Sequence, residues 1–295
     1  MSRSLILRPP AKINLTLSVG PARDDGYHEV RTLLQSIALS DAIVVSARRG
    51  PFSLAARAPG VPADRTNLVW KAAQALWTAI GREGEPRDVH IKLDKQIPIE
   101  AGLGGGSADA AAALAALNVV WDGRRSRRQL LDVARTIGAD VPFPLQGGTA
   151  LAVGRGDELY PVDDVERLGV ILIKPSFGVG TGDAYRWLDE DRAAGLAGSA
   201  ATAEVDVGWS SGPVSMVNDL EAPVGRRHPG IGQMLDALRR AGAMGAGMSG
   251  SGSAVFGLFS EAGARSAVRQ LQRPDWLVVL TRTLSRREAV RRIGV

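Results

Sequence analysis

Residues 98–108 read PIEAGLGGGSA, and this glycine-rich segment lies between two stretches of different periodicity. Before it, residues 89–93 alternate apolar and polar side chains, as a half-buried strand does. After it, residues 107–121 are rich in alanine and place large apolar side chains three and four positions apart, as a helix does. The sequence therefore predicts a strand, a glycine loop and a helix in this order.

The glycines of this loop predict a phosphate-binding site. Gly102 and residues 104–106 let the backbone fold tightly enough to aim successive N–H groups at an anion, and the N-terminus of the following helix adds about half a positive charge. Two common nucleotide motifs do not fit, because a Walker loop ends in G-K-[ST] and the dinucleotide fingerprint has a third glycine where Ser107 stands. Read alone, the segment also fits a tight turn without a ligand.

A second strand is predicted near the N-terminus. Apolar and polar side chains alternate strictly over residues 12–19, so Lys12 and Asn14 point to the same side of the strand. Two polar groups that share one face are candidates for a site.

The composition changes near the middle of the chain. Prolines and acidic residues interrupt the apolar pattern over residues 160–167, before a predicted buried strand at 170–173. We therefore expect two lobes of mixed α and β structure, 1–160 and 161–295, which fits a chain of 295 residues.

The second half contains two further segments of unusual composition. Residues 193–213 are rich in Ala, Gly and Ser without a sustained period, which predicts a long mobile loop. A glycine-rich stretch at 242–252 precedes a predicted strand at 255–259.

Composition limits the classes of protein to consider. The chain has no cysteine, which excludes disulfides, thiolate metal sites and a catalytic thiol. Its N-terminal apolar run is too short for a signal peptide or a membrane span, so we expect a soluble cytoplasmic protein. A net charge of +5 and a pI near 9.9 indicate an anionic partner, either phosphorylated metabolites or nucleic acid.

Four segments stand in order along the chain: AKINLTL at 11–17 with DGYHE at 25–29, the glycine loop at 98–108, GADVPF at 138–143, and MSGSGSAVF at 248–256. Together they resemble the motifs of the GHMP kinases, a superfamily of small-molecule kinases. The triple glycine and the Gly-Tyr-His stretch are similar to the branch that phosphorylates a cytidine diphosphate alcohol. The resemblance covers nearly the whole chain.

This resemblance implies a two-lobed α+β fold, with an N-terminal lobe like ribosomal protein S5 domain 2, a ferredoxin-like C-terminal lobe and the active site between them. It implies ATP-dependent phosphorylation of the 2-hydroxyl of 4-diphosphocytidyl-2-C-methyl-D-erythritol, a step of non-mevalonate isoprenoid precursor synthesis.

Two residues are candidates for the chemistry. Phosphoryl transfer requires positioning, charge neutralisation and a group that orients or deprotonates the attacking hydroxyl. Asp140 lies between a predicted helix and Pro142, and it matches the catalytic aspartate of the family; Lys12 matches the lysine beside it. Without the resemblance, Asp140 would read as a helix cap or surface residue and Lys12 as a solvated charge.

The acceptor is expected to bind through a separate set of side chains. An aromatic ring stacks on a base, and an imidazole both donates and accepts hydrogen bonds at a pyrimidine edge. By resemblance we assign Tyr27 and His28 to the cytosine and Tyr185 to a second aromatic contact, with Asn14 and Thr181 also at the acceptor. A Tyr-His pair in a turn also fits partly buried packing.

The nucleotide is expected at the glycine loop and beside it. Asn67 and Lys95 match positions that line the adenine and phosphate pocket, although a helix cap and a solvated lysine explain them equally well. The expected ATP-binding residues are Asn67, Lys95, Pro98, Ile99, Glu100, Ala101, Gly102, Leu103, Gly104, Gly105, Gly106, Ser107 and Ala108. We expect the late glycine segment, 247–253, to pack against this loop, or else to form a purely structural turn.

The loop departs from the superfamily at one position. Where many members read GLGSS, this chain reads GLGGGS, so the serine hydroxyl that would approach magnesium is displaced by one residue. We still expect Mg²⁺ with ATP, because it neutralises the phosphate oxygens, but the sequence assigns no metal ligand.

Two other functions compete with this interpretation. Another GHMP kinase, acting on homoserine or a mevalonate derivative, is opposed by the Gly-Tyr-His stretch and the triple glycine. A nucleic-acid-binding module is suggested by the pI and the S5-like lobe, and it predicts salt-sensitive RNA affinity without ATP turnover. We expect small-molecule substrates, no nucleic acid, no membrane, and a monomer or weak homodimer.

Overall fold

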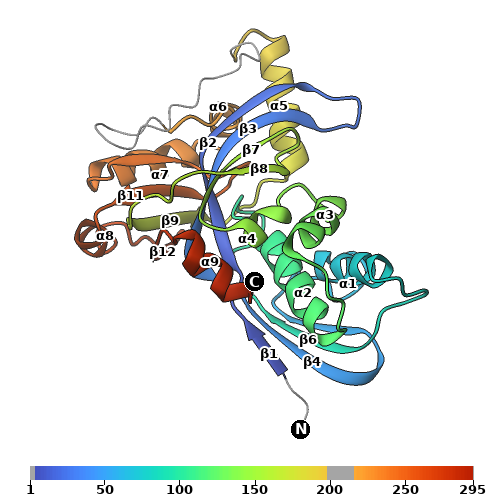
Figure 1. Cartoon of the computed structure of the whole chain (residues 1–295). Helices are drawn as coiled ribbons and strands as arrows, with labels where there is room; N and C mark the ends of the chain where they lie inside the picture. The colour runs from blue at the N-terminus through green and yellow to red at the C-terminus, as the bar shows by residue number, and fades with distance from the viewer. Residues whose placement is uncertain (1–3, 198–215, 295) are drawn as a thin grey trace.

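The computed structural model describes residues 4–197 and 216–294, and its strands form three four-stranded sheets (Figure 1). Most of the loop expected at 193–213 lies outside the described residues. Within the described ranges, no helix combines the length and the apolar composition that crossing a membrane requires.

The central sheet contains the long hairpin that runs between the two lobes (Figure 1). Its strands are, in spatial order, β2 (Pro10–Ala22), β3 (His28–Ser40), β7 (Thr149–Val153) and β8 (Glu158–Pro161). The strand predicted at 12–19 is confirmed within β2, but both of its faces are buried: Lys12 is 7% exposed and Asn14 5%. The polar face of β2 is therefore buried inside the protein and is not a solvent-exposed surface.

The second sheet and four helices belong to the half of the chain that contains the predicted glycine loop. The strands are, in spatial order, β1 (Ser4–Leu7), β4 (Ala42–Pro51), β6 (Arg87–Asp94) and β5 (Ser53–Arg57), and the helices are α1 (Leu68–Ala79), α2 (Gly105–Val120), α3 (Arg127–Ile137) and α4 (Pro142–Gln146). The predicted strand at 89–93 and helix at 107–121 are confirmed as β6 and α2. Because α2 is almost entirely alanine and leucine on its buried surface, α1 packs closely against it, and one apolar core joins both helices to the sheet.

The third sheet makes a separate layer of the second half. Its strands are, in spatial order, β10 (Gly245–Met248), β11 (Val255–Phe259), β9 (Gly169–Pro175) and β12 (Trp276–Arg282), and the helices of this half are α5 (Thr181–Ala193), α6 (Glu221–Arg227), α7 (Gly230–Arg240) and α8 (Glu261–Ala267). With α7 and α8 as the crossovers, the chain order is βαββαβ and every pairing is antiparallel. The expected ferredoxin-like arrangement is confirmed, as are the strands predicted at 170–173 and 255–259.

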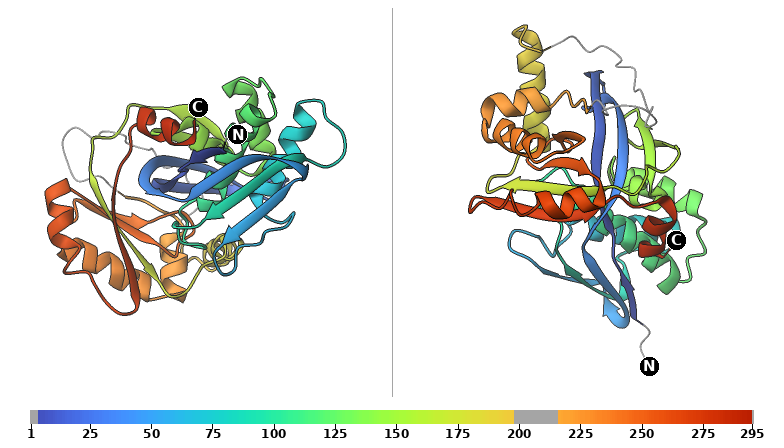
Figure 2. Two further views of the ribbon diagram at one scale, coloured as in Figure 1. Left: turned by 90° about the horizontal axis from the view of Figure 1, so that it is seen from below. Right: turned by 90° about the vertical axis from the view of Figure 1, so that its left-hand side faces the viewer.

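The last helix returns to the first half of the chain. Helix α9 (Arg286–Ile293) packs on α4 and α2, and Ile293 is fully buried in the core that contains α1 and α2. Both views of Figure 2 place this red helix beside the green helices. The lobe boundary expected near residue 160 stays a prediction.

Candidate active site

A cavity of about 730 Å³ lies where the central hairpin meets the glycine loop and α5. Residues from every expected group line it: Lys12, Asp140, Glu100, Gly102, Gly104, Ser107, Asn14, Tyr27, His28, Thr181 and Tyr185. Segments more than 200 residues apart along the chain therefore meet at one site, since Gly250 and Ser251 line it as well.

The glycine loop is held in a backbone conformation that side chains oppose. Gly102 and Gly104 have φ values of +71° and +68°, in the left-handed region that favours glycine. A Cβ on Gly102 would lie 1.9 Å from the carbonyl oxygen of Ser249, and one on Gly104 would lie 3.0 Å from Cγ of Lys12. Glycine is required here by both the torsion angle and the lack of space.

The late glycine segment packs directly on this loop, as expected from the sequence. The Ser249 hydroxyl donates to the Gly102 carbonyl at 2.9 Å, and the backbone N–H of Ser253 donates to the Glu100 carbonyl at 3.3 Å. Asn218, which sequence reasoning missed, donates its side-chain amide to the carbonyls of Met248 and Gly250, both at 2.8 Å. The expected contact is confirmed, and it fixes the loop from the side of the C-terminal lobe.

Lys12 and Asp140 are neighbours, as the sequence predicts. The Lys12 ammonium lies 3.6 Å from Oδ2 of Asp140 and donates to Oδ1 of Asn14 at 2.6 Å. The Asn14 amide in turn donates to the Thr32 hydroxyl at 2.8 Å, and Thr32 donates to the carbonyl of Thr16. This chain of hydrogen bonds fixes the ammonium on the cavity wall, while the Asp140 side chain, 43% exposed, faces the open space.

Three aromatic side chains, Tyr27, His28 and Tyr185, share the lining of the same cavity. The rings of His28 and Tyr185 are 5.0 Å apart between centroids and tilted by 33°. The Tyr27 ring is 45% exposed, and the guanidinium of Arg155 lies 5.1 Å from its centroid. Burial, with the nearby charge of Asp140, raises the pKa of the Tyr185 phenol, so the hydroxyl stays protonated and able to donate.

Two residues of this region were missed from the sequence. Asp189 accepts a hydrogen bond from Nε2 of His28 at 3.0 Å, and it follows Tyr185 by one helical turn on α5. Arg155 is held by Asp157 at 2.6 Å. The i, i+4 spacing of Tyr185 and Asp189 was a usable signal for the first, because such residues share a helix face.

The structure places Asn67 and Lys95 outside the cavity lining. Asn67 is the N-cap of α1, where its Oδ1 accepts from the backbone N–H of Val69 at 2.9 Å. The helix-cap interpretation is therefore confirmed for this residue. A contact of Asn67 or Lys95 with ATP stays a prediction.

Lys95 belongs to a buried ion-pair cluster behind the glycine loop. Its ammonium donates to Asp109 at 2.7 Å and also to Asp41, and these side chains are 7%, 3% and 0% exposed. The interpretation as a solvated lysine is therefore wrong. Asp41 also accepts the backbone N–H of Ile97 at 2.8 Å, so the cluster anchors the segment that leads into the loop.

One carboxylate oxygen of this cluster has no hydrogen-bond donor among the described residues. Oδ1 of Asp109 is buried and has no hydrogen-bond partner among the described residues. Burial raises the pKa of Asp109 well above its ordinary value, and the charge of Asp41 adds to this effect, although Lys95 opposes it. The ionised cluster is therefore costly to bury, and Lys95 is what holds it together.

The oxygen donors at the cavity suit a hard divalent cation. Glu100, Ser107 and Asp140 all line it. Among the described residues, no cluster of three or more acidic, histidine or cysteine side chains forms a metal-binding group. This donor set fits Mg²⁺ that takes most of its ligands from phosphate and water.

Two family models match the chain, and both describe GHMP kinases. The model of the GHMP kinases N terminal domain matches residues 67–148, and the model of the GHMP kinases C terminal domain matches residues 208–274.

Relatives of known name agree over most of the chain. A protein of Pelotomaculum thermopropionicum named 4-diphosphocytidyl-2-C-methyl-D-erythritol kinase is 42% identical, covering 94% of this chain and 97% of its own. One of the same name from Anaeromyxobacter dehalogenans is 44% identical, covering 91% and 85%. A crystal structure of 4-(cytidine 5'-diphospho)-2C-methyl-D-erythritol kinase, 34% identical, superposes with a TM-score of 0.73 and covers 95% of this chain and 99% of that one. The chain therefore belongs to the GHMP kinase family.

Proposed function

We propose that this protein transfers the γ-phosphoryl group of ATP to the 2-hydroxyl of 4-diphosphocytidyl-2-C-methyl-D-erythritol. The observation that carries the proposal is the shared cavity, whose lining includes the Lys12–Asp140 pair, the glycine loop and the Tyr27, His28 and Tyr185 rings. The names of relatives at 42% and 44% identity support the choice of acceptor.

The glycine loop is the proposed phosphate site. Its backbone N–H groups and the N-terminus of α2 are a fixed set of donors for an anion. The contacts from Ser249 and Ser253 keep these donors in place. The loop would therefore bind ATP phosphates without reorganising.

The chemical step needs a proton acceptor and a positive charge near the reacting oxygen. In the proposed step the acceptor hydroxyl oxygen forms a bond to the γ-phosphorus, the bond from that phosphorus to the bridging oxygen of ADP breaks, and the hydroxyl proton passes to Asp140. Lys12, fixed by Asn14, stabilises the carboxylate before transfer and the developing negative charge during it. Mg²⁺ bound with ATP would neutralise phosphate charge, and Glu100 and Ser107 are the residues that would hold it.

The aromatic end of the cavity is the proposed cytidine site. Tyr27 offers an exposed ring for stacking, while His28, oriented by Asp189, offers a polar edge. The hydroxyl groups of Thr181 and Ser251 share a hydrogen bond of 3.2 Å, which links α5 to the late glycine segment. Cytoplasmic location, the absence of nucleic-acid and membrane partners, and a monomeric or weakly dimeric state are proposed from the sequence alone.

An ADP-release assay across several acceptors tests the function. With ATP and Mg²⁺ we expect turnover of the cytidine diphosphate alcohol and little turnover of homoserine, mevalonate or the same polyol phosphate without the cytidine group. Asp140→Asn protein serves as the background control. Equal turnover of homoserine or mevalonate would contradict the proposed acceptor, and RNA affinity without ADP release would support the nucleic-acid alternative.

A further inference from the structure

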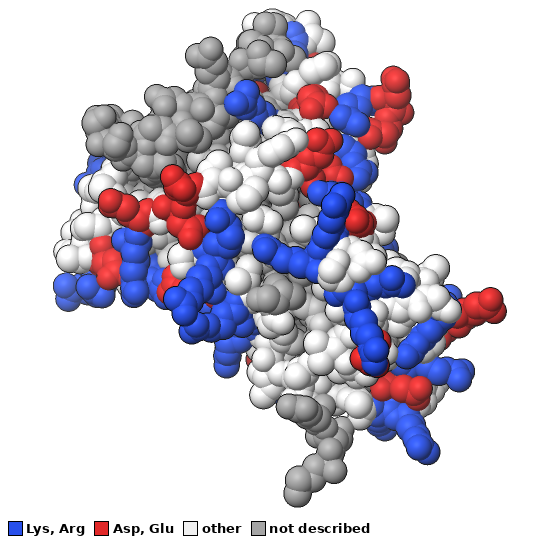
Figure 3. All heavy atoms as spheres, in the orientation of Figure 1, with Lys and Arg blue, Asp and Glu red and all other residues white. Residues whose placement is uncertain are grey.

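A second cavity, of about 510 Å³, shares no lining residue with the candidate active site. It lies between the end of β3, the residue after Lys95, and the β9, α8 and β12 elements of the C-terminal lobe. Figure 3 shows basic side chains gathered on the face of the molecule that carries α8, β12 and α9. A volume of this size suits a small molecule.

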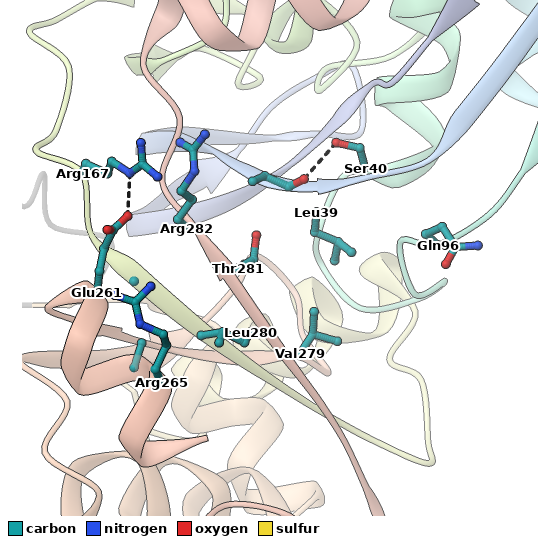
Figure 4. Close-up of a pocket in the computed structure, with 13 residues that line it drawn as sticks. Leu39, Ser40, Gln96, Arg167, Glu261, Arg265, Val279, Leu280, Thr281 and Arg282 are labelled. Atoms are coloured by element: carbon teal, nitrogen blue, oxygen red, sulfur yellow. Dashed lines mark hydrogen bonds and ion pairs between the residues drawn. The ribbon is translucent and has the colours of Figure 1, made fainter. Parts of the chain in front are cut away.

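The charged groups of this cavity are mostly positive. Arg167 lies in the loop before β9, Arg265 on α8 and Arg282 on β12, whereas Glu261 is the one acidic residue in the lining (Figure 4). Glu261 accepts a hydrogen bond from Arg167 at 2.5 Å. That bond, with the charges of all three arginines, lowers the pKa of Glu261 despite some burial. Within the lining, one carboxylate faces three guanidinium groups, and since Arg282 is also paired with Glu288, one positive charge is left in excess.

The arginines differ in how they are held. Arg282 is fixed by hydrogen bonds to Glu288, the shorter at 2.8 Å, and to the carbonyl of Thr283. Arg265 is exposed, and within residues 4–197 and 216–294 it has neither a hydrogen bond nor an ion pair. It is therefore a guanidinium that is free to bind a ligand.

A further arginine keeps this region positive. Arg292 donates to the Ala38 carbonyl at 3.1 Å and to the Ser40 hydroxyl at 2.8 Å, and both residues line the cavity. Burial lowers the pKa of Arg292, and the charges of Arg282 and Arg8 lower it further, although Glu288 opposes them. The wall of the cavity is thus backed by additional positive charge.

The rest of the lining is partly apolar. Leu39, Val279 and Leu280 line the cavity beside the arginines, and Leu280 is 42% exposed. In the view of Figure 4, Leu280 lies beside Arg265, whereas Leu39 and Val279 lie farther from Arg167. The lining is therefore suited to an anion that carries a short apolar group.

We propose that this cavity binds a small organic diphosphate, with the diphosphate on Arg167, Arg265 and Arg282 and an apolar substituent on Leu39, Val279 and Leu280. Guanidinium groups suit this anion because their planar donors bind phosphate oxygens in pairs. Free inorganic diphosphate shares the anionic part of this chemistry but not the apolar part.

Calorimetric titration at low ionic strength tests the proposal, with n-pentyl diphosphate and inorganic diphosphate as probes. We expect Arg265→Glu to weaken binding of both probes about tenfold or more, since a charge-assisted hydrogen bond is lost and a repulsive charge added. Arg269→Glu, the same charge change beyond the end of α8 and outside the lining, should change binding less than about twofold. Arg265→Ala, which adds no negative charge, should give a smaller loss than Arg265→Glu.

Two further measurements separate this cavity from the active site and from a purely ionic effect. The ATP KM of Arg265→Glu should equal that of the wild type. Leu280→Ser should weaken n-pentyl diphosphate and leave inorganic diphosphate unchanged. Equal losses in Arg265→Glu and Arg269→Glu, or a matching rise in the ATP KM, would overturn the proposed site; equal affinity of the wild type for the two probes would overturn its apolar part.

Discussion

The two ends of the candidate active site are built in different ways. At the phosphate end, the backbone of the glycine loop makes the site, and a Cβ on Gly102 or Gly105 would lie within 3.0 Å of other atoms. At the acceptor end, the side chains of Tyr27, His28 and Tyr185 make the site around open space. Substitutions at the phosphate end should therefore cost folding free energy, whereas those at the acceptor end should change substrate binding alone.

The largest expected effect is on the buried ion-pair cluster behind the loop. Lys95→Met should lower the free energy of unfolding by about 3–5 kcal/mol, because it leaves Asp41 and Asp109 buried without their cation. Urea denaturation measures this loss. Lys92→Met changes an exposed lysine on β6, the strand that precedes Lys95; it is the control and should change stability by less than about 0.5 kcal/mol.

The stability of the Lys95→Met variant should also depend on pH, in a direction that follows from the Asp109 pKa. A carboxyl whose pKa is higher in the folded state gains relative stability as the pH falls through that pKa, and the Asp109 pKa is already raised by burial and by Asp41. Removing the lysine raises it further. The stability difference between wild type and Lys95→Met should therefore shrink as the pH falls toward the ordinary pKa of an aspartate; a constant difference would show that the lost interaction is not ionic.

The next largest effect is a difference in stability between substitutions at two glycines of the glycine loop, Gly102 and Gly106. Gly102→Ala should destabilise the protein by about 3 kcal/mol or more and abolish turnover, because its φ is +71° and its Cβ would lie 1.9 Å from the Ser249 oxygen. Gly106→Ala meets only Leu68, at 3.6 Å, and should fold like the wild type. Equal thermal unfolding of the two variants would mean that this loop is not held by the late glycine segment.

Substitution of Lys12 or Asp140 should lower the catalytic rate and leave the stability of the protein unchanged. Lys12→Met and Asp140→Asn should each lower kcat by on the order of 10² or more, since electrostatic and proton-transfer contributions have this size. Because the two groups lie 3.6 Å apart and act as a unit, the double variant should lose less than the product of the single losses. Steady-state kinetics of all four proteins checks this, and fully multiplicative losses would refute the shared role.

The smallest effect is expected at the acceptor end. Tyr27→Ala and His28→Ala should raise the KM for the acceptor about 5- to 150-fold, through the loss of stacking or of a hydrogen bond worth roughly 1–3 kcal/mol. The ATP KM should stay within about threefold. Kinetics with each substrate varied in turn decides the matter, because a parallel rise in both constants would make these residues part of the scaffold.

Local patterns predicted the elements around the loop well. The alternation at 12–19 and 89–93 and the alanine-rich stretch at 107–121 depend only on residues close together in the sequence. Such local patterns are enough to predict a strand or a helix and the side of it that is buried. The late glycine segment was expected to pack against the loop, and the hydrogen bonds from the Ser249 hydroxyl and the Ser253 backbone N–H to the loop bear this out.

The cluster of Asp41, Lys95 and Asp109 was not predictable from local pattern. Its members come from a strand corner, a loop and a helix, and the Lys95–Asp41 contact joins residues 54 positions apart. Only the pairing of β4 with β6 and the packing of α2 bring them together. The same limitation applies to Arg155, whose position over Tyr27 depends on the pairing of β7 with β3 of the hairpin.

The return of α9 to the first lobe has a consequence for synthesis on the ribosome. Ile293 fills the core around α1 and α2, and the carbonyl of Arg292 accepts the backbone N–H of Arg8, so a helix that is translated after the second lobe completes a part that is translated before that lobe. At 5–20 residues per second, roughly 7–27 s pass between residues 160 and 293. During this interval we expect the nascent lobe to expose apolar surface that the finished chain buries, which proteolysis of chains stalled before and after residue 293 would measure.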